Sequence, residues 1–191
     1  PMGGSLLFYS LKEPVGVAGQ IVPWNYPLTM TTWKLAPALA AGCSIVLKPD
    51  SQTPLSALRM AELATEVGFP PGALNVVPGA GKTVGAHLVQ HPGVDKIAFT
   101  GSTATGAEIM RLGSDSIKRL TLELGGKSPN LVFADADLDS AIPSAVWSIY
   151  YSAGQSCEAR SRVLVERSIY DDFVAAFTEK AGQLKVGDPL D

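Results

Sequence analysis

The amino-acid sequence predicts an α/β fold in which a doubly wound parallel sheet is followed by the beginning of a second α/β unit. Three observations lead to this prediction. Of the 191 residues, 46% are hydrophobic and 17% are charged, a composition typical of a packed globular core. Short apolar runs alternate with longer segments of helical periodicity, the pattern of parallel strands joined by helical crossovers. A Gly125-Gly126 pair then interrupts this alternation.

The part of the chain up to residue 124 is expected to contain five buried strands, because its apolar runs are short and rich in β-branched residues. These strands are expected at 15–22, 44–47, 74–77, 96–99 and 120–124. Helices are expected between them at 28–41, 54–67, 83–89 and 103–112. In the second helix, Thr53 is predicted to be the N-cap and Pro54 the first helical residue, since these residue types favour those positions.

The remainder of the chain shows the same alternation on a smaller scale. A strand is expected at 131–133, a helix at 138–151, a strand at 162–165 and a helix at 169–184. We therefore predict one domain over residues 1–124 and the start of a second over residues 125–191. The sequence begins on Pro1 and stops in a turn-like run directly after a helical pattern, so the chain is expected to be a fragment of a longer gene product.

Charge and composition narrow the classes of function. A net charge of −3 and a pI near 5.4 argue against nucleic acid or an anionic membrane surface as a partner. The sequence contains no uncharged apolar run of about 18 residues, as a membrane span requires. Residues 1–10 lack the basic start of a signal peptide. Two cysteines make no disulfide framework, so a reducing, cytoplasmic location is expected.

Cys157 is the first candidate for chemistry, because it lies in a small, polar, glycine-containing loop between a predicted helix and a predicted strand. A cysteine thiolate adds readily to a carbonyl carbon and later leaves from a thioester. The alternative is a partly buried thiol that packs like a small apolar side chain. Cys43 enters an apolar strand and is predicted to lie in the core.

Glu123 is the second candidate, because it interrupts the apolar run 120–124 at the end of a predicted parallel strand. Ligands of such sheets bind at the carboxyl ends of the strands, where a carboxylate is able to act as a general base. The alternative is a strand-end glutamate that faces solvent. His87 and His91 are interpreted as surface residues, and no metal site is predicted.

Three further features indicate ligand contacts only weakly. The turn 101–106 is flanked by glycines and opens a helix, where unpaired N–H groups favour a phosphate; an ordinary capped turn has the same pattern. Lys48 ends the second strand and is either a contact for a ribose or phosphate group or simply solvated. Asn25 follows the first strand, and its amide is either an oxyanion donor or part of the turn.

Together these segments resemble the aldehyde dehydrogenase superfamily, and the resemblance runs from about Glu13 to Asp191. Six motifs in the family's order carry it: GQIVPWNYPL at 19–28, WKLAPAL at 33–39, LKP at 47–49, FTGS at 99–102, LELGGKSP at 122–129 and GQSC at 154–157. The resemblance implies a Rossmann-like NAD(P)-binding domain over residues 1–124, with its N-terminal part missing. Residues 125–191 would then begin a catalytic domain that carries the nucleophilic cysteine.

The resemblance also implies a role for each candidate residue. Cys157 would attack a small-molecule aldehyde, Asn25 and the Cys157 N–H would bind the oxyanion, and Glu123 would activate the water that hydrolyses the thioester. Lys48 would bind the adenosine ribose, and the turn from Gly101 to Gly106 would face the pyrophosphate. The cofactor-binding residues implied in this way are Ile21, Val22, Pro23, Trp24, Lys48, Ser51, Gly81, Lys82, Phe99, Thr100, Gly101, Ser102, Gly106, Leu124 and Gly125.

The choice of cofactor stays open between NAD and NADP. Relatives that prefer NAD often carry a glutamate where this sequence has Ser51, and Lys82 adds positive charge on the same side. The resemblance further implies a homo-oligomer, a dimer or tetramer, in the full-length enzyme. Two alternatives to hydrolytic aldehyde oxidation are an acylating enzyme that transfers the thioester to coenzyme A and a catalytically incompetent nucleotide-binding fragment.

Overall fold

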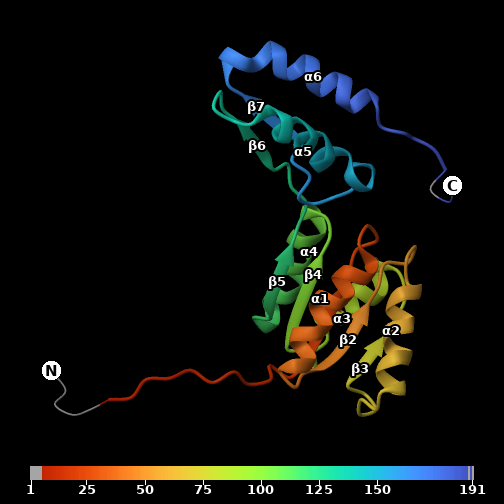
Figure 1. Cartoon of the computed structure of the whole chain (residues 1–191). Coiled ribbons are helices and arrows are strands. Elements are labelled where there is room, and N and C mark those ends of the chain that lie inside the picture. Colours follow the sequence, from red (N-terminus) through yellow and green to blue (C-terminus); the bar gives the residue numbers. More distant parts are fainter. Residues whose placement is uncertain (1–5, 189, 191) are drawn as a thin grey trace. The chain divides into compact units, whose positions relative to one another are not determined.

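The computed structural model describes residues 6–188 and 190 (Figure 1). The chain divides into two compact units, of which the first ends at Leu124 and the second begins at Gly125. This division falls at the glycine pair where the sequence places its domain boundary. No helix in the described part of the chain has the length and apolar character that a membrane span requires.

The first unit is built on a parallel five-stranded sheet. Its strands are β1 (Val17–Ile21), β2 (Ser44–Lys48), β3 (Leu74–Val76), β4 (Lys96–Thr100) and β5 (Arg119–Glu123). Their order is β3-β2-β1-β4-β5, so the chain proceeds outward from β1 in one direction and then returns to add β4 and β5 on the other side. This confirms the predicted doubly wound sheet and puts the reversal of strand order between β1 and β4, where sheets of this class bind ligands.

Helices pack on both faces of this sheet (Figure 1). They are α1 (Pro27–Ala40), α2 (Leu55–Glu66), α3 (Ala86–Gln90) and α4 (Thr103–Gly113). On one face, Leu35 of α1 and Ala57 of α2 pack with Ile45 and Leu47 of β2. On the other face, side chains of α3 and α4 pack with Ile97, a fully buried residue of β4. Burial on both faces explains why these strands are continuously apolar in the sequence.

The second unit has a two-stranded parallel sheet, made of β6 (Pro129–Val132) and β7 (Arg162–Val165). Two helices, α5 (Leu138–Tyr150) and α6 (Tyr170–Gly182), follow these strands. Val132, Ala145 and Phe173 form the buried centre of this unit. The 3₁₀ turn Tyr151–Gly154 directly follows α5 and leads into the loop that holds Cys157.

The structure corrects two local predictions. The second helix begins at Leu55 with Pro54 as its N-cap, and the Thr53 hydroxyl makes no hydrogen bond within the described residues, so the predicted threonine cap is wrong. The preceding turn takes Thr53 out of the cap position, because its backbone N–H donates to the carbonyl of Asp50. The helix predicted at 83–89 instead begins with a π-helical turn, Gly81–Gly85, which runs into α3.

Candidate functional site

The carboxyl edge of the sheet brings several predicted site residues into register. Ile21 is paired with Lys48 on one side and with Phe99 on the other, and Thr100 is paired with Glu123. Ile21 and Phe99 are buried in the apolar core, which holds the ends of β1 and β4 together. The chain leaves β1 through buried Val22, half-buried Pro23 and exposed Trp24, and Asn25 is half-buried just before α1. Residues far apart in the sequence are therefore gathered at one edge.

The turn after β4 attaches the beginning of α4 to this edge. The Gly101 N–H donates to the carbonyl of Glu123 at 3.0 Å. Ser102 is the N-cap of α4, and its hydroxyl accepts a hydrogen bond from the Thr105 N–H at 3.1 Å. A Cβ at Gly106 would lie 2.6 Å from Leu124 Cδ2, so any larger residue there would force the Leu124 side chain to move. The result is a capped helix N-terminus at the switch point of the sheet, a position that favours anionic groups.

Lys48 is not a solvated strand-end lysine, since only 5% of its surface is exposed. Its Nζ donates to the carbonyl of Pro49 at 2.9 Å. Burial lowers the pKa of the Lys48 ammonium, and the nearby charge of Asp50 partly opposes this change. A buried cation with one backbone acceptor is poised to donate to further acceptors, because an ammonium has three N–H donors.

A cavity of about 710 Å³ lies beside Lys48 and the π-helical turn Gly81–Gly85. Both Lys48 and Lys82 line it. Gly81 and Lys82 are exposed, as is Ser51 in the turn that follows β2. Short π-helical turns are rare and frequently occur at functional sites. The predicted lysines and the π-helical turn thus border one cavity.

Glu123 is exposed at the end of β5, and Lys34 of α1 lies within electrostatic reach of its carboxylate. Burial is the main reason that the pKa of Lys34 is lowered; the charge of Glu123 raises this pKa, and Lys96 lowers it further. The Lys34 backbone also accepts a hydrogen bond from the Gln20 amide at 2.8 Å. Lys34 is not among the residues predicted from the sequence. It is the single charged residue within 27–40, and this isolated charge was the signal that could have identified it.

The second unit contains Cys157, which is exposed and has a free thiol, whereas Cys43 of the first unit is buried as predicted. The approach to Cys157 is a strained turn, because Ser152 and Ala153 have φ values of 53° and 55° and Gly154 also has positive φ. A Cβ at Gly126 would lie 3.0 Å from the Cys157 carbonyl oxygen. The glycine pair therefore permits close contact between its own segment and the cysteine loop.

The predicted residues are thus distributed over both units. Cys157 and Gly125 belong to the second unit, and the other predicted catalytic and cofactor residues belong to the first. His87 and His91 are exposed, as expected. The described residues contain no group of three or more His, Cys, Asp or Glu side chains arranged to hold a metal ion.

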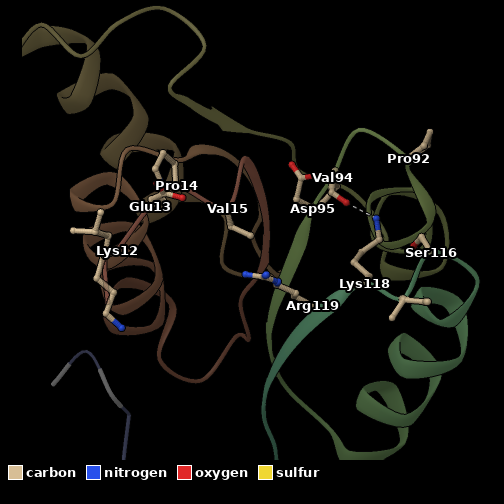
Figure 2. A pocket seen from close by; sticks show the side chains of 12 residues that line it. Lys12, Glu13, Pro14, Val15, Pro92, Val94, Asp95, Ser116, Lys118 and Arg119 are labelled. Carbon is tan, nitrogen blue, oxygen red and sulfur yellow. Dashed lines mark hydrogen bonds between the residues drawn. The ribbon is translucent and has the colours of Figure 1, made fainter. Parts of the chain in front are cut away.

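Another cavity, of about 680 Å³, lies near the amino ends of β4 and β5 (Figure 2). Asp95 accepts a hydrogen bond from the Val17 N–H at 2.8 Å, and Lys118 donates to the carbonyls of His91 and Val94. None of the predicted catalytic or cofactor residues lines this cavity. Its polar contacts connect neighbouring elements, so we assign it no part in the candidate site.

The model of the aldehyde dehydrogenase family matches residues 3–191. The chain belongs to the aldehyde dehydrogenase family. Among curated relatives, retinal dehydrogenase 2 of Mus musculus is 53% identical over 192 residues, and aldehyde dehydrogenase 1A1 of Oryctolagus cuniculus is 53% identical over 191. Both matches cover 100% of this chain, but only 37% and 38% of those relatives, so the chain spans little more than a third of their length.

Solved structures of family members agree with this membership. A putative aldehyde dehydrogenase from Burkholderia cenocepacia matches with a TM-score of 0.92 and 54% identity, covering 94% of this chain and 37% of that one. The NAD+ complex of an aldehyde dehydrogenase from Bacillus cereus matches with a TM-score of 0.89 and 55% identity, covering 92% of this chain and 36% of that one. The α/β fold is therefore that of known aldehyde dehydrogenases.

Proposed function

We propose that the chain carries the cofactor-binding and nucleophile segments of an enzyme that oxidises an aldehyde to a carboxylate with NAD or NADP. The observation that carries the proposal is the carboxyl edge of the sheet, where buried Lys48, the capped N-terminus of α4 and Glu123 occur together in a family member. The exposed, free Cys157 supplies a nucleophile in the second unit.

The residues of the first unit fit a dinucleotide. The Lys48 ammonium is suited to the adenosine ribose, and the amides from Gly101 to Gly106 are suited to the pyrophosphate. The buried hydroxyl of Thr100 has no hydrogen-bond partner within residues 6–188, which leaves a polar atom for a ligand beside this turn. Ile21, Val22, Pro23 and Trp24 would line the path of the dinucleotide. Family structures solved with NAD+ support the same assignment.

In the proposed reaction, the Cys157 thiolate adds to the aldehyde carbon and forms a thiohemiacetal. The Asn25 amide and the Cys157 N–H hold the resulting oxyanion, and the loss of one such donor typically costs about 3–4 kcal/mol of transition-state stabilisation. A nicotinamide cofactor, when bound, would supply the hydride acceptor that allows the thiohemiacetal carbon to lose a hydride and become a thioester. Glu123 then removes a proton from water, which attacks the thioester and releases the carboxylate and the Cys157 thiol.

Lys34 is a positioning residue for Glu123 in this proposal. Its partly buried ammonium lies within electrostatic reach of the Glu123 carboxylate, and the attraction between the two charges helps to hold the carboxylate in position. Glu123 at the strand end also favours hydrolysis over transfer of the thioester to coenzyme A.

The cytoplasmic location and the homo-oligomeric full-length enzyme stay predictions.

The test separates acylation from hydrolysis. Incubation of the chain with an aldehyde and NAD or NADP should reduce the cofactor, as followed by absorbance, and Cys157→Ala should abolish the reduction while the neighbouring Ser156→Ala retains it. Glu123→Gln should give a single turnover and an acyl adduct on Cys157, detected by the mass of the intact protein. Reduction that persists in Cys157→Ala would overturn the proposed nucleophile.

Two further outcomes identify the alternatives. If coenzyme A, but not water, releases the adduct from the unchanged chain, the enzyme is of the acylating type. If the chain binds NAD or NADP but neither reduces it nor forms an adduct, the chain is a nucleotide-binding part without catalysis. Binding of the cofactor without catalysis has a specific basis, because the chain covers only 37% of the length of retinal dehydrogenase 2 of Mus musculus.

A further inference from the structure

Gln20 is a polar side chain in an otherwise apolar strand. It belongs to β1, only 1% of its surface is exposed, and it is paired with Leu47 of β2 and Ala98 of β4. Its Oε1 atom is buried and has no hydrogen-bond partner within the described residues. Burial of an unpaired polar atom costs free energy, so the packing of the sheet does not explain a glutamine at this position.

The Gln20 amide group binds α1 at a turn that lacks one helical hydrogen bond. Gln20 Nε2 donates to the carbonyl of Lys34 at 2.8 Å. Pro37 lies inside α1 and has no N–H, so it cannot donate to the carbonyl of Trp33, four residues earlier. The helix is therefore weakened next to Lys34, and Gln20 supplies a hydrogen bond from the sheet at this turn.

The sheet register places Gln20 on the face of the sheet that also carries Glu123. Paired residues of parallel strands point to the same face, and side chains alternate along each strand. Gln20 is paired with Ala98 of β4, and Thr100 follows on the same face of that strand. Thr100 is in turn paired with Glu123. Lys34 belongs to α1, which packs on this face, and its ammonium lies within electrostatic reach of the Glu123 carboxylate.

We propose that Gln20 is a positioning residue whose hydrogen bond to the Lys34 carbonyl holds this turn of α1, so that the Lys34 ammonium stays beside Glu123. Gln20 acts through Lys34 and takes no part in the bond changes. This inference rests on the proposed role of Glu123 in thioester hydrolysis and names the residue of the sheet that fixes its cationic neighbour. Loss of the Gln20 amide should slow the hydrolysis of an acyl group on Cys157 without slowing its formation.

The first measurement is the titration of the Lys34 side chain, which needs neither substrate nor cofactor. Lysine labelled with ¹³C at Cε gives one NMR signal per residue, and the Lys34 signal is the one lost in Lys34→Arg. Burial lowers the pKa of Lys34, while the charges of Glu123 and Lys96 act on it in opposite directions. In Gln20→Met, which replaces the amide by an apolar group of similar length, the titration midpoint should rise toward the ordinary lysine value, because the released side chain gains contact with water.

The second measurement is the hydrolysis of an acyl group on Cys157. The probe 4-nitrophenyl acetate acetylates a thiolate with release of 4-nitrophenolate, and water then hydrolyses the thioester to acetate. The unchanged chain should give a burst of 4-nitrophenolate from acetylation, followed by a slower steady release that is limited by hydrolysis. Gln20→Met should keep the burst and slow the steady release about tenfold, since a small displacement of a catalytic group has effects of at least this size.

Thr31→Val is the matched control in both measurements. Thr31 of α1 is fully buried, and its hydroxyl donates to the carbonyl of Pro27 at 2.7 Å, at the beginning of the helix and away from the Lys34 turn. This variant should leave the Lys34 titration and the steady release unchanged. Its midpoint of unfolding in urea should fall at least as much as that of Gln20→Met, which removes an unpaired buried atom together with the hydrogen bond. Gln20→Leu carries the same test if Gln20→Met does not fold.

Three results would overturn the inference and leave the proposed function intact. These are an unchanged Lys34 midpoint in Gln20→Met, an equal change in Thr31→Val, and a raised midpoint with unchanged steady release. The absence of a burst from the unchanged chain, or a burst that persists in Cys157→Ala, would instead contradict the proposed nucleophile. The Lys34 titration then still decides whether Gln20 positions Lys34.

Discussion

Replacement of Gly19 by alanine would place a methyl group in a closely packed part of β1. The new Cβ would lie 2.6 Å from Ile97 Cδ1, 3.1 Å from Val94 Cγ1 and 3.2 Å from Leu88 Cγ. These three residues are buried in one cluster, with exposures of 0%, 5% and 8%. The first distance is too short for van der Waals contact, so the Ile97 side chain or the strand would have to move.

Overpacking of this kind typically destabilises a core by about 1–3 kcal/mol. Ile97→Val removes the Cδ1 atom at the shortest contact and by itself should cost about 0.5–1.5 kcal/mol. In the double variant, the alanine methyl would occupy part of the space that Cδ1 vacates. The two substitutions should therefore couple, with the double variant about 1 kcal/mol more stable than the sum of the single effects predicts.

Urea unfolding of the chain, the two single variants and the double variant measures this coupling as a difference in the free energy of unfolding. Gly81→Ala is the matched control, because its Cβ would have no atom within 4 Å and its stability should change by less than about 0.5 kcal/mol. Additive effects of Gly19→Ala and Ile97→Val, or a neutral Gly19→Ala, would refute the packing argument.

Three other predictions concern the turns and the buried lysine. Ala153→Gly should raise the free energy of unfolding by about 0.5–1 kcal/mol, because glycine relieves the strain of φ 55°, and a loss of stability in urea would contradict the assigned turn. Ser102→Ala should cost about 1 kcal/mol by removal of the α4 cap, while Ser102→Asp, which still caps, should cost less in the same measurement. Burial lowers the pKa of Lys48, so the Lys48 ammonium of the folded state loses its proton at a lower pH than that of the unfolded state. The free energy of unfolding should therefore rise with pH between the folded pKa and about 10.5. This rise should be smaller in Lys48→Met. Equal pH dependence of both proteins in urea titrations would show that burial does not perturb Lys48.

The sequence by itself determined the strands, the helices between them and the motifs that identify the family. These properties are local: β-branched apolar runs favour buried strands, helical periodicity marks the crossovers, and a glycine pair breaks the pattern. The position of Cys157 in a polar loop and that of Glu123 at a strand end follow from the same local order, as does the burial of Cys43. Two local predictions failed. The Thr53 cap failed because the Thr53 backbone N–H is held in a turn by the carbonyl of Asp50, and the helix predicted at 83–89 begins instead with the π-helical turn Gly81–Gly85.

Only the tertiary structure decided which side chains share an environment. Lys48 resembles any strand-end lysine in the sequence, but in the fold it is paired with Ile21 of β1, its stem lies beside Gly85 of the π-helical turn, and only 5% of its surface is exposed. Lys34 and Glu123 are separated by most of the first unit in sequence, and the strand order places them within electrostatic reach. The left-handed conformation of Ser152 and Ala153 is likewise disfavoured locally. For the two lysines, contacts between distant segments decide the environment, because burial and sheet register act on the whole unit at once.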